Sequence, residues 1–205
     1  MQLLNNEKLF FGLFMIIFFM GWILRGYYSR NSPDYKKSLS ELKRQPLQYE
    51  SRESFALLSL FGITLFMALI IYAFYTSMFY WMQMPLIAIV RWIGVIIGLC
   101  SLPLIGWVQW TLGESFSKTL TIQKDHKLIT TGPYSRIRHP MYSVHTIWFL
   151  SWFFISTNLL FAVSWILWIC YVIIRIPQEE KMLIETFGDK YREYMENTGS
   201  LFPRM

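Results

Sequence analysis

Long apolar runs alternate with polar, basic segments along the chain. The runs occupy residues 9–24, 55–75, 86–110, 141–154 and 159–176. A helix needs about 20 apolar residues to cross the hydrocarbon core of a bilayer, so this pattern predicts an all-α integral membrane protein with about five transmembrane helices. Only residues 155–158 separate the last two runs, which predicts a tight antiparallel helical hairpin with Asn158 as the cap of its second helix.

Composition agrees with a single membrane-embedded domain over residues 1–205. The chain is 54% hydrophobic and only 16% charged, whereas soluble domains are roughly 45–50% apolar. A net charge of +6 suggests nucleic acid at first sight. The basic residues, however, lie beside apolar runs and no nucleic-acid motif accompanies them, so the charge is interpreted as membrane orientation.

The basic residues predict how the chain is oriented in the membrane. All of the 19 lysines and arginines except Lys8 and Arg91 fall in the first loop, the third loop or the C-terminal end. Because Lys and Arg concentrate in cytoplasmic loops, we expect these three segments to face the cytoplasm and the N-terminus to lie outside. No small-residue cleavage site follows the first run, so it is expected to be a retained helix.

Several turn and cap residues predict the elements around the hairpin. Pro140 suits the first turn of the fourth span, and Pro177 suits the first turn of a separate tail helix. Gly188 suits a helix stop, and a second short helix is expected over residues 189–197. Residues 119–122 and 127–130 flank a polar turn and form a weak hairpin pattern.

Candidate chemistry lies where the fifth run ends. Arg175 and Glu179 stand four residues apart and share one face of a helix, whereas Glu180 points about 100° away. Pro177 lies between them and removes a backbone hydrogen bond, which opens this face. An arginine at the end of an apolar helix is also a common membrane anchor, but the paired Glu179 favours a functional site.

Other polar residues have both structural and functional interpretations. His139 precedes Pro140 and fits a helix cap or a catalytic group at the membrane surface. Tyr134 and Tyr142 fit an interfacial aromatic belt as well as a pocket. His145, inside the fourth span, is either a buried polar contact or a group facing a path through the protein.

Absent motifs narrow the possibilities. The sequence contains no GxGxxG, no P-loop, no HExxH and no GxSxG. Cys100 and Cys170 show no metal-ligand spacing, so no metal site is expected. What remains is a composite cytoplasmic pocket built from the third loop, the Arg138–Pro140 segment and the turn at residues 175–180.

Three stretches together carry a family resemblance. They are LGESFS (residues 112–117), HKLITTGPYSRIRHPMY (residues 126–142) and RIPQEEKMLIETFGDKYREYMENTGSLFP (residues 175–203). This combination resembles the isoprenylcysteine carboxyl methyltransferase family over residues 107–205, about half the chain, which is expected to be the catalytic half. Phe116 stands where that family commonly has tryptophan, and Ser143 and Val144 stand where many members have glycine. The short chain is more similar to prokaryotic members, which implies the cell membrane; a eukaryotic member would imply the endoplasmic reticulum.

The resemblance implies methyl transfer from S-adenosylmethionine to the carboxylate of a prenylated cysteine or a similar lipid-like acceptor that enters from the bilayer. Arg175 and Glu179 would be the catalytic residues, with Arg175 facing the acceptor and Glu179 also contacting the cofactor. By the same resemblance the other cofactor-binding residues are His126, Lys127, Leu128, Ile129, Tyr134, His139, Pro140, Met141 and Tyr142.

Three alternatives remain open. A phospholipid or other amine N-methyltransferase would need a base to deprotonate its acceptor, with His139 or Glu180 as candidates. A sterol or quinone reductase of related architecture would depend on NADPH. A small transporter or lipid-binding protein would use His145 and Arg175 along a path, but the two halves show no inverted repeat, which disfavours it.

Overall fold

The computed structural model describes residues 7–31, 51–74, 80–84, 88–112 and 128–204, and these residues are helical with short connections. The elements, in chain order, are α1 (Glu7–Asn31), α3 (Arg52–Phe74), the 3₁₀ helix η2 (Tyr80–Met82), α4 (Ala88–Leu112), the 3₁₀ helix η4 (Gly132–Ser135), α5 (Pro140–Ser156), α6 (Leu159–Phe187) and α7 (Asp189–Asn197). The predicted all-α architecture is confirmed for these residues. The weak hairpin pattern predicted over residues 119–130 lies mostly outside the described residues, and its last part, residues 128–130, has no regular structure.

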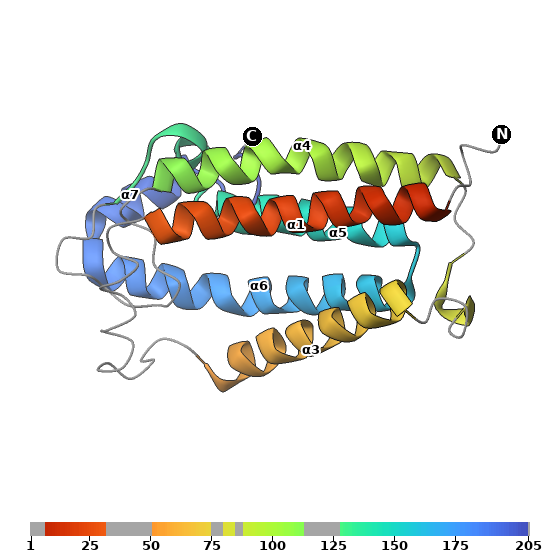
Figure 1. Cartoon of the computed structure of the whole chain (residues 1–205). Helices are drawn as coiled ribbons and strands as arrows, with labels where there is room; N and C mark the ends of the chain where they lie inside the picture. The colour runs from red at the N-terminus through yellow and green to blue at the C-terminus, as the bar shows by residue number, and fades with distance from the viewer. Residues whose placement is uncertain (1–6, 32–50, 75–79, 85–87, 113–127, 205) are drawn as a thin grey trace.

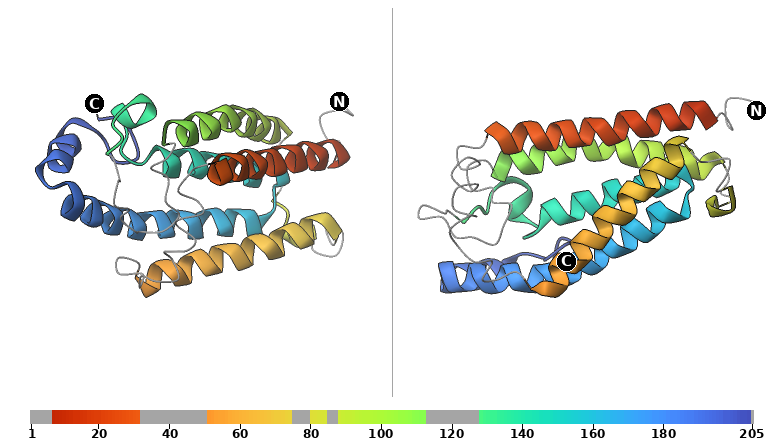
Figure 2. Two further views of the ribbon diagram at one scale, coloured as in Figure 1. Left: turned by 60° about the vertical axis from the view of Figure 1, so that its left-hand side comes forward. Right: turned by 60° about the horizontal axis from the view of Figure 1, so that its bottom comes forward.

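The five long helices run side by side in one bundle (Figure 1). Helix α3 packs on α6, α6 on α5, and α5 on α4, while α1 packs against both α4 and α5. The short helices η4 and α7 lie together at one end, and the turn between α5 and α6 lies at the other (Figures 1 and 2). We call these the site end and the far end of the bundle.

The boundaries of α5 and α6 follow from their caps. Helix α5 begins at Pro140, as predicted, because proline pre-forms the first helical turn and lacks only an N–H that would have no helical partner there. Thr157 adopts a left-handed conformation (φ 54°) that ends α5. The Asn158 side chain then accepts a hydrogen bond from the Leu160 N–H at 2.9 Å, which confirms Asn158 as the cap of α6.

The tail differs from the prediction at Pro177. Pro177 does not begin a separate helix but lies inside α6, which runs without a break from Leu159 to Phe187. Proline removes one backbone hydrogen bond, to the Ile173 carbonyl, and the turns on both sides of it supply the rest. Gly188 (φ 58°) ends α6 and α7 spans Asp189–Asn197, so the predicted stop and the predicted second helix are confirmed.

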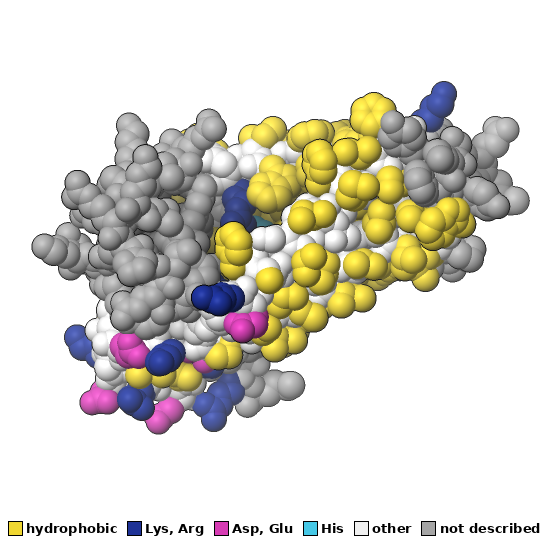
Figure 3. Space-filling model, turned by 90° about the horizontal axis from the view of Figure 1, so that it is seen from below, with side chains coloured by type: hydrophobic (Ala, Val, Ile, Leu, Met, Phe, Trp, Pro, Cys, Tyr) yellow, Lys and Arg dark blue, Asp and Glu magenta, His cyan; other side chains and the backbone are white. Residues whose placement is uncertain are grey.

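Four helices, α1, α3, α4 and α6, are long and apolar enough to cross a membrane. Helix α5 has 17 residues, so its crossing stays a prediction. Apolar side chains cover much of the described part of the face shown in Figure 3. The exposed apolar side chains of the bundle include Ile63 and Phe66 of α3 and Ile166 and Ile173 of α6. Charged side chains gather at one end of that face, as expected where a bundle leaves the apolar layer.

The bundle core is mainly aromatic. Trp148 and Trp152 of α5 are almost fully buried, with their ring centroids 4.6 Å apart. Phe18 of α1 packs 4.9 Å from Trp152, and Trp168 of α6 packs 4.9 Å from Phe149 of α5. These contacts join α1 and α6 to α5 and fix the position of this central helix, which begins at the site end.

Candidate active site

The site end brings together the end of α4, the segment 128–139, the C-terminal part of α6, and α7 (Figure 1). The described parts of the third loop, the Arg138–Pro140 segment and the 175–180 turn therefore meet at this end, and their role as a functional pocket stays a prediction. The segment 113–127, which includes the predicted site residues His126 and Lys127, lies outside them.

Backbone pairing fixes the Arg138–Pro140 segment against the C-terminal tail. The Arg138 N–H donates to the Gly199 carbonyl at 2.8 Å and the His139 N–H to the Ser200 carbonyl at 3.0 Å. The Ser143 hydroxyl donates to the Leu201 carbonyl at 2.6 Å. Gly199 has no room for a side chain, because a Cβ there would lie 1.7 Å from the Phe202 carbonyl oxygen. The start of α5 is thereby set by residues about 60 positions later in the chain.

Arg138, His139 and Glu180 form a closed polar cluster. Arg138 Nε donates to Glu180 Oε1 at 2.9 Å, and His139 Nε2 lies 3.2 Å from the same oxygen. Arg138 also donates to the Met195 carbonyl at 3.1 Å and to the Thr198 carbonyl. Arg138 thus ties α6 to the end of α7, a supporting role that uses charge-assisted hydrogen bonds.

The neighbouring carboxylate, Glu179, has different surroundings. The Tyr142 hydroxyl of α5 donates to Glu179 Oε2 at 2.9 Å. Arg175 lies one turn earlier on α6 and its residue surface is only 3% exposed. The two adjacent glutamates therefore point to different partners, as the helical spacing predicted.

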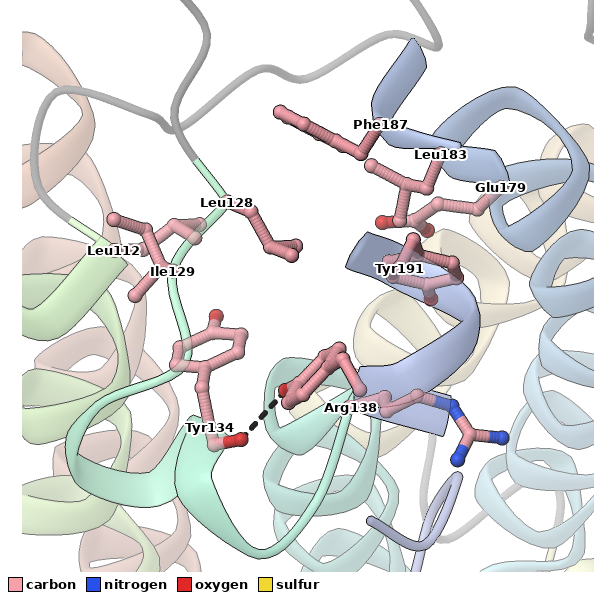
Figure 4. Close-up of a pocket in the computed structure, with 10 residues that line it drawn as sticks. Leu112, Leu128, Ile129, Tyr134, Arg138, Glu179, Leu183, Phe187 and Tyr191 are labelled. Carbon is pink, nitrogen blue, oxygen red and sulfur yellow. Dashed lines mark hydrogen bonds between the residues drawn. The ribbon is translucent and has the colours of Figure 1, made fainter. Parts of the chain in front are cut away.

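Glu179 lines a pocket at the site end that holds about 430 Å³ of unfilled space, part of it open to solvent. Figure 4 shows Leu128, Ile129 and Tyr134 on one side of the space and Glu179, Leu183 and Phe187 of α6 on the other, with the Arg138 guanidinium turned away from it. The pocket lining consists of Leu112, Leu128, Ile129, Tyr134, Arg138, Glu179, Leu183, Phe187, Tyr191 and Tyr194.

Three tyrosines make the pocket a source of hydroxyl donors. Burial raises the pKa of Tyr134 and of Tyr191, and raises the pKa of Tyr194 to about 12, so all three stay protonated at neutral pH. The Tyr194 hydroxyl donates to the Tyr134 carbonyl at 2.5 Å. The Tyr191 hydroxyl is buried and has no hydrogen-bond partner among the described residues. A buried hydroxyl in this state is suited to a ligand.

The predicted site residues fall into two groups. Leu128, Ile129, Tyr134 and Glu179 line the pocket, and Tyr142 joins them through Glu179. The remaining described residues of the prediction, His139, Pro140, Met141 and Arg175, lie outside that lining. His139 and Pro140 are buried at the start of α5.

Besides Arg138, which belongs to the predicted Arg138–Pro140 segment, five lining residues were not predicted, and two patterns in the sequence mark most of them. Leu183 and Phe187 follow Glu179 at intervals of four, so they lie on its face of α6. Tyr191 and Tyr194 are three apart on α7 and share a face. The fifth, Leu112, ends α4, and nothing in its sequence context distinguishes it.

Comparisons with known proteins match the second half of the chain. The model of the isoprenylcysteine carboxyl methyltransferase (ICMT) family matches residues 92–185. Protein-S-isoprenylcysteine O-methyltransferase B of Arabidopsis thaliana is 35% identical over 97 residues, which cover 45% of this chain and 49% of that protein. Protein-S-isoprenylcysteine O-methyltransferase of Schizosaccharomyces pombe is 39% identical over 98 residues, covering 44% and 40% of the two chains.

A solved structure shares the fold. The structure of the eukaryotic intramembrane Ras methyltransferase ICMT superposes with a TM-score of 0.58 at 23% identity, covering 71% of this chain and 52% of that one. With its four apolar helices, the chain is therefore an integral membrane protein. The match spans about half the length of these relatives or less.

The family assignment follows from these matches together. The expectation of a prokaryotic-type member is not supported, because the two isoprenylcysteine methyltransferases named above come from a plant and a yeast and the solved structure is eukaryotic. The family match covers the hairpin of α5 and α6 and both residues of the Arg175–Glu179 pair. We conclude that the region 92–185 belongs to the isoprenylcysteine carboxyl methyltransferase family.

Proposed function

We propose that this chain is an S-adenosylmethionine-dependent methyltransferase that acts on the carboxylate of a prenylated cysteine or a similar lipid-like acceptor in the membrane. The observation that carries the proposal is the placement of Glu179, which lines the pocket, is bound by Tyr142, and lies one turn from Arg175. The names of the matched relatives support the acceptor class.

The pocket has the chemistry that S-adenosylmethionine needs. This cofactor has a flat aromatic base, whose faces pack on apolar side chains, at one end and a sulfonium and an ammonium, both positively charged, towards the other. Leu128, Ile129 and Leu183 offer an apolar wall, and Glu179 offers negative charge. The buried Tyr191 hydroxyl supplies a donor that has no partner among the described residues.

We propose that the cofactor binds in this pocket and that residues near the pocket also belong to the cofactor site. Leu128, Ile129, Tyr134 and Glu179 would contact the cofactor directly. By family resemblance His126, Lys127, His139, Pro140, Met141 and Tyr142 would complete the site. Of these, Tyr142 has a further role that the geometry suggests, because its hydroxyl fixes the Glu179 carboxylate.

Arg175 is proposed to bind the acceptor. When bound, S-adenosylmethionine supplies a methyl group on a positively charged sulfur, and an acceptor oxygen forms the new bond as sulfur keeps the electron pair of the old one. A carboxylate is already ionised at pH 7, so no general base is required. Arg175 would hold the carboxylate in line, and its buried position excludes water that would otherwise stabilise the anion.

A carboxylate acceptor fits better than an amine. An amine must lose a proton, and the candidate bases are His139 and Glu180. His139 Nε2 lies 3.2 Å from Glu180 Oε1, and Arg138 Nε donates to the same oxygen at 2.9 Å. Since His139 and Glu180 also lie outside the pocket lining, neither is placed to take a proton from a ligand there.

The test is a titration of purified, detergent-solubilised protein with S-adenosylmethionine by calorimetry, in parallel with NADPH. We expect saturable binding of S-adenosylmethionine that Glu179→Ala or Tyr142→Ala abolishes. Transfer of a labelled methyl group to N-acetyl-S-farnesylcysteine is then measured. Arg175→Ala should impair use of this acceptor more than it impairs cofactor binding, and equal loss of both would contradict the assignment.

The matched control is Glu193→Gln, a carboxylate on the exposed surface of α7, which should bind the cofactor as the wild type does. Binding of NADPH without S-adenosylmethionine would support a reductase instead. A folded protein that binds neither would exclude both enzymes.

We also propose that the pocket faces the cytoplasm, with the N-terminus outside. The support is the concentration of basic residues, such as Arg136 and Arg192, at the site end, while Lys8 and Arg91 lie at the other end of α1 and α4. Single cysteines placed at Lys8 and at Glu193, in a variant lacking Cys100 and Cys170, should react with an impermeant thiol reagent from opposite sides of intact cells or vesicles.

A further inference from the structure

An arginine and a histidine meet inside the bundle, outside the pocket described above. Arg25 Nη1 of α1 lies 2.7 Å from Nε2 of His145 on α5. His145 is 1% exposed, and its Nδ1 lies 2.7 Å from the Met141 carbonyl oxygen. A carbonyl only accepts, so Nδ1 carries the proton and Nε2 accepts from Arg25. His145 is therefore a neutral group that orients a cation.

The contact between Arg25 and His145 depends on one glycine, at which α1 and α5 approach closely. Helices α1 and α5 pack together, and Gly21 lies directly against the Trp148 ring; a Cβ at Gly21 would fall 2.0 Å from that ring. Arg25 is one turn beyond Gly21, and His145 is one turn before Trp148. In an antiparallel pair these steps lead in the same direction, towards the site end, so the close approach at Gly21 brings Arg25 to His145.

Arg25 lies next to the residues that hold Glu179. Its partner His145 lies three residues after Tyr142 on α5, about one turn along the same face. The ring centroids of Tyr142 and His145 each lie 6.1 Å from Trp168 of α6, and Tyr142 binds Glu179 at 2.9 Å. Arg25 of α1 thus lies on the side of α5 that holds Glu179, while Arg175 lies one turn before Glu179 on α6.

Arg25 is half-buried, whereas Arg175 is almost fully buried. The apolar face in Figure 3 is hollowed at one place, where a basic side chain and a histidine are visible among apolar side chains. A cation exposed at membrane depth is costly, and it usually marks a functional site. Arg25 also precedes the family-matched region 92–185, so the family match does not account for it.

We propose that Arg25 is a second acceptor-binding residue, which binds the acceptor carboxylate together with Arg175 and selects anionic over neutral lipids. This inference rests on the proposed methyltransferase function. His145 acts as a positioning residue, because it fixes the guanidinium from behind without touching the acceptor. A lipid-like anion that approaches through the apolar face would exchange its hydration for two charge-assisted hydrogen-bond donors.

The test compares two probes, N-acetyl-S-farnesylcysteine and its carboxamide, which differ in charge but not in lipid. The wild type should bind the acid more tightly than the amide. In Arg25→Gln we expect the KM of the acid to rise about 10-fold or more, with kcat within about 3-fold, because the lost interaction contributes to ground-state binding. Amide binding and S-adenosylmethionine binding should stay within about 2-fold of the wild type.

Two further variants keep the inference falsifiable if Arg25→Gln folds poorly. Arg25→Lys retains the charge and should restore part of the preference for the acid. His145→Gln should weaken binding of the acid, as Arg25→Gln does, because it removes the group that holds the Arg25 guanidinium in place. Arg91→Gln is the matched control: it also removes an arginine from an apolar helix, but at the far end, so the acid-to-amide ratio should not change.

The outcomes separate the two proposals. If Arg25→Gln weakens acid and amide equally, or leaves the preference for the acid intact in a folded protein, Arg25 has only a structural role. If the wild type shows no preference for the acid and transfers no methyl group, the proposed function fails and the role of Arg25 fails with it.

Discussion

The two ends of the bundle each contain a largely buried arginine bound to a glutamate, and the pocket described above lies at the site end. At the far end, Arg91 of α4 donates to Glu7 of α1, with Nη2 and Oε2 3.0 Å apart, and to the Ile155 carbonyl at 3.0 Å. Its guanidinium also lies 4.0 Å from the centre of the Phe10 ring. At the site end, Arg138 makes the corresponding contact with Glu180.

The two ends of the bundle differ at the residue beside the paired glutamate. Glu179 adjoins Glu180 in sequence, yet it faces the pocket and binds a tyrosine rather than an arginine. An ion pair near a membrane surface is thus weak evidence of function, since both ends have one. A carboxylate that faces open space, beside a second and separately held carboxylate, is the feature that distinguishes the site end.

Removing Arg138 should have the largest effect. Arg138→Met leaves Glu180 without its main partner and frees the Met195 and Thr198 carbonyls. Loss of one partner from a mostly buried pair costs about 3–5 kcal/mol, so the free energy of unfolding should fall by this order. Thermal unfolding in detergent measures it. A stability equal to the wild type would show that Arg138 does not hold the tail.

Glu179→Gln should separate function from stability at the site end. The substitution keeps the size of the side chain and can still accept from Tyr142, but it removes the negative charge. We expect methyl transfer to fall about 100-fold, the usual effect of losing one electrostatic contact to a reacting group. Thermal unfolding should be nearly unchanged. Glu180→Gln should show the reverse pattern, and equal behaviour of the two variants would contradict the division of roles.

Arg91→Gln should lower the stability of the protein without changing its affinity for the cofactor. The variant leaves the Ile155 carbonyl without its donor and removes the pair with Glu7, whose side chain is 66% exposed. The exposure of Glu7 limits the loss to about 1–3 kcal/mol. Cofactor affinity, measured by calorimetry, should match the wild type. A changed affinity would mean that the two ends are coupled.

The smallest effect is expected at the hairpin turn. Asn158→Ala removes the side-chain oxygen that accepts from the Leu160 N–H, and loss of such a cap costs about 1 kcal/mol. Asn158→Ser retains an acceptor and is the matched control. Thermal unfolding of both variants measures the cap, and catalytic activity should be equal in the two proteins because the turn lies at the far end.

Local signals in the sequence predicted much of the bundle. Pro140, Asn158 and Gly188 each mark a helix boundary in the structure, because a cap or a fixed dihedral acts within a few residues. The same reasoning placed Pro177 at the start of a helix, where the structure has it inside α6. Proline permits both positions, and the packing of α6 against α3 and α5 decides between them.

The candidate site divides in the same way. Helical spacing alone set Glu179 apart from Glu180, since residues four apart share a face and neighbours do not. The spacing does not say which carboxylate faces a pocket. That depends on Arg138, which lies 42 residues earlier and is brought to Glu180 by the pairing of residues 138–139 with 199–200.

The sequence by itself determined that the chain is helical, apolar enough for a membrane, and similar in its second half to one methyltransferase family. These properties depend on composition and on contacts between near neighbours. The tertiary structure alone decided the partners of the site-end residues: Arg138 binds Glu180, Tyr142 binds Glu179, and Arg25 meets His145. Each of these contacts joins residues 37 or more positions apart, and no local pattern encodes such a distance.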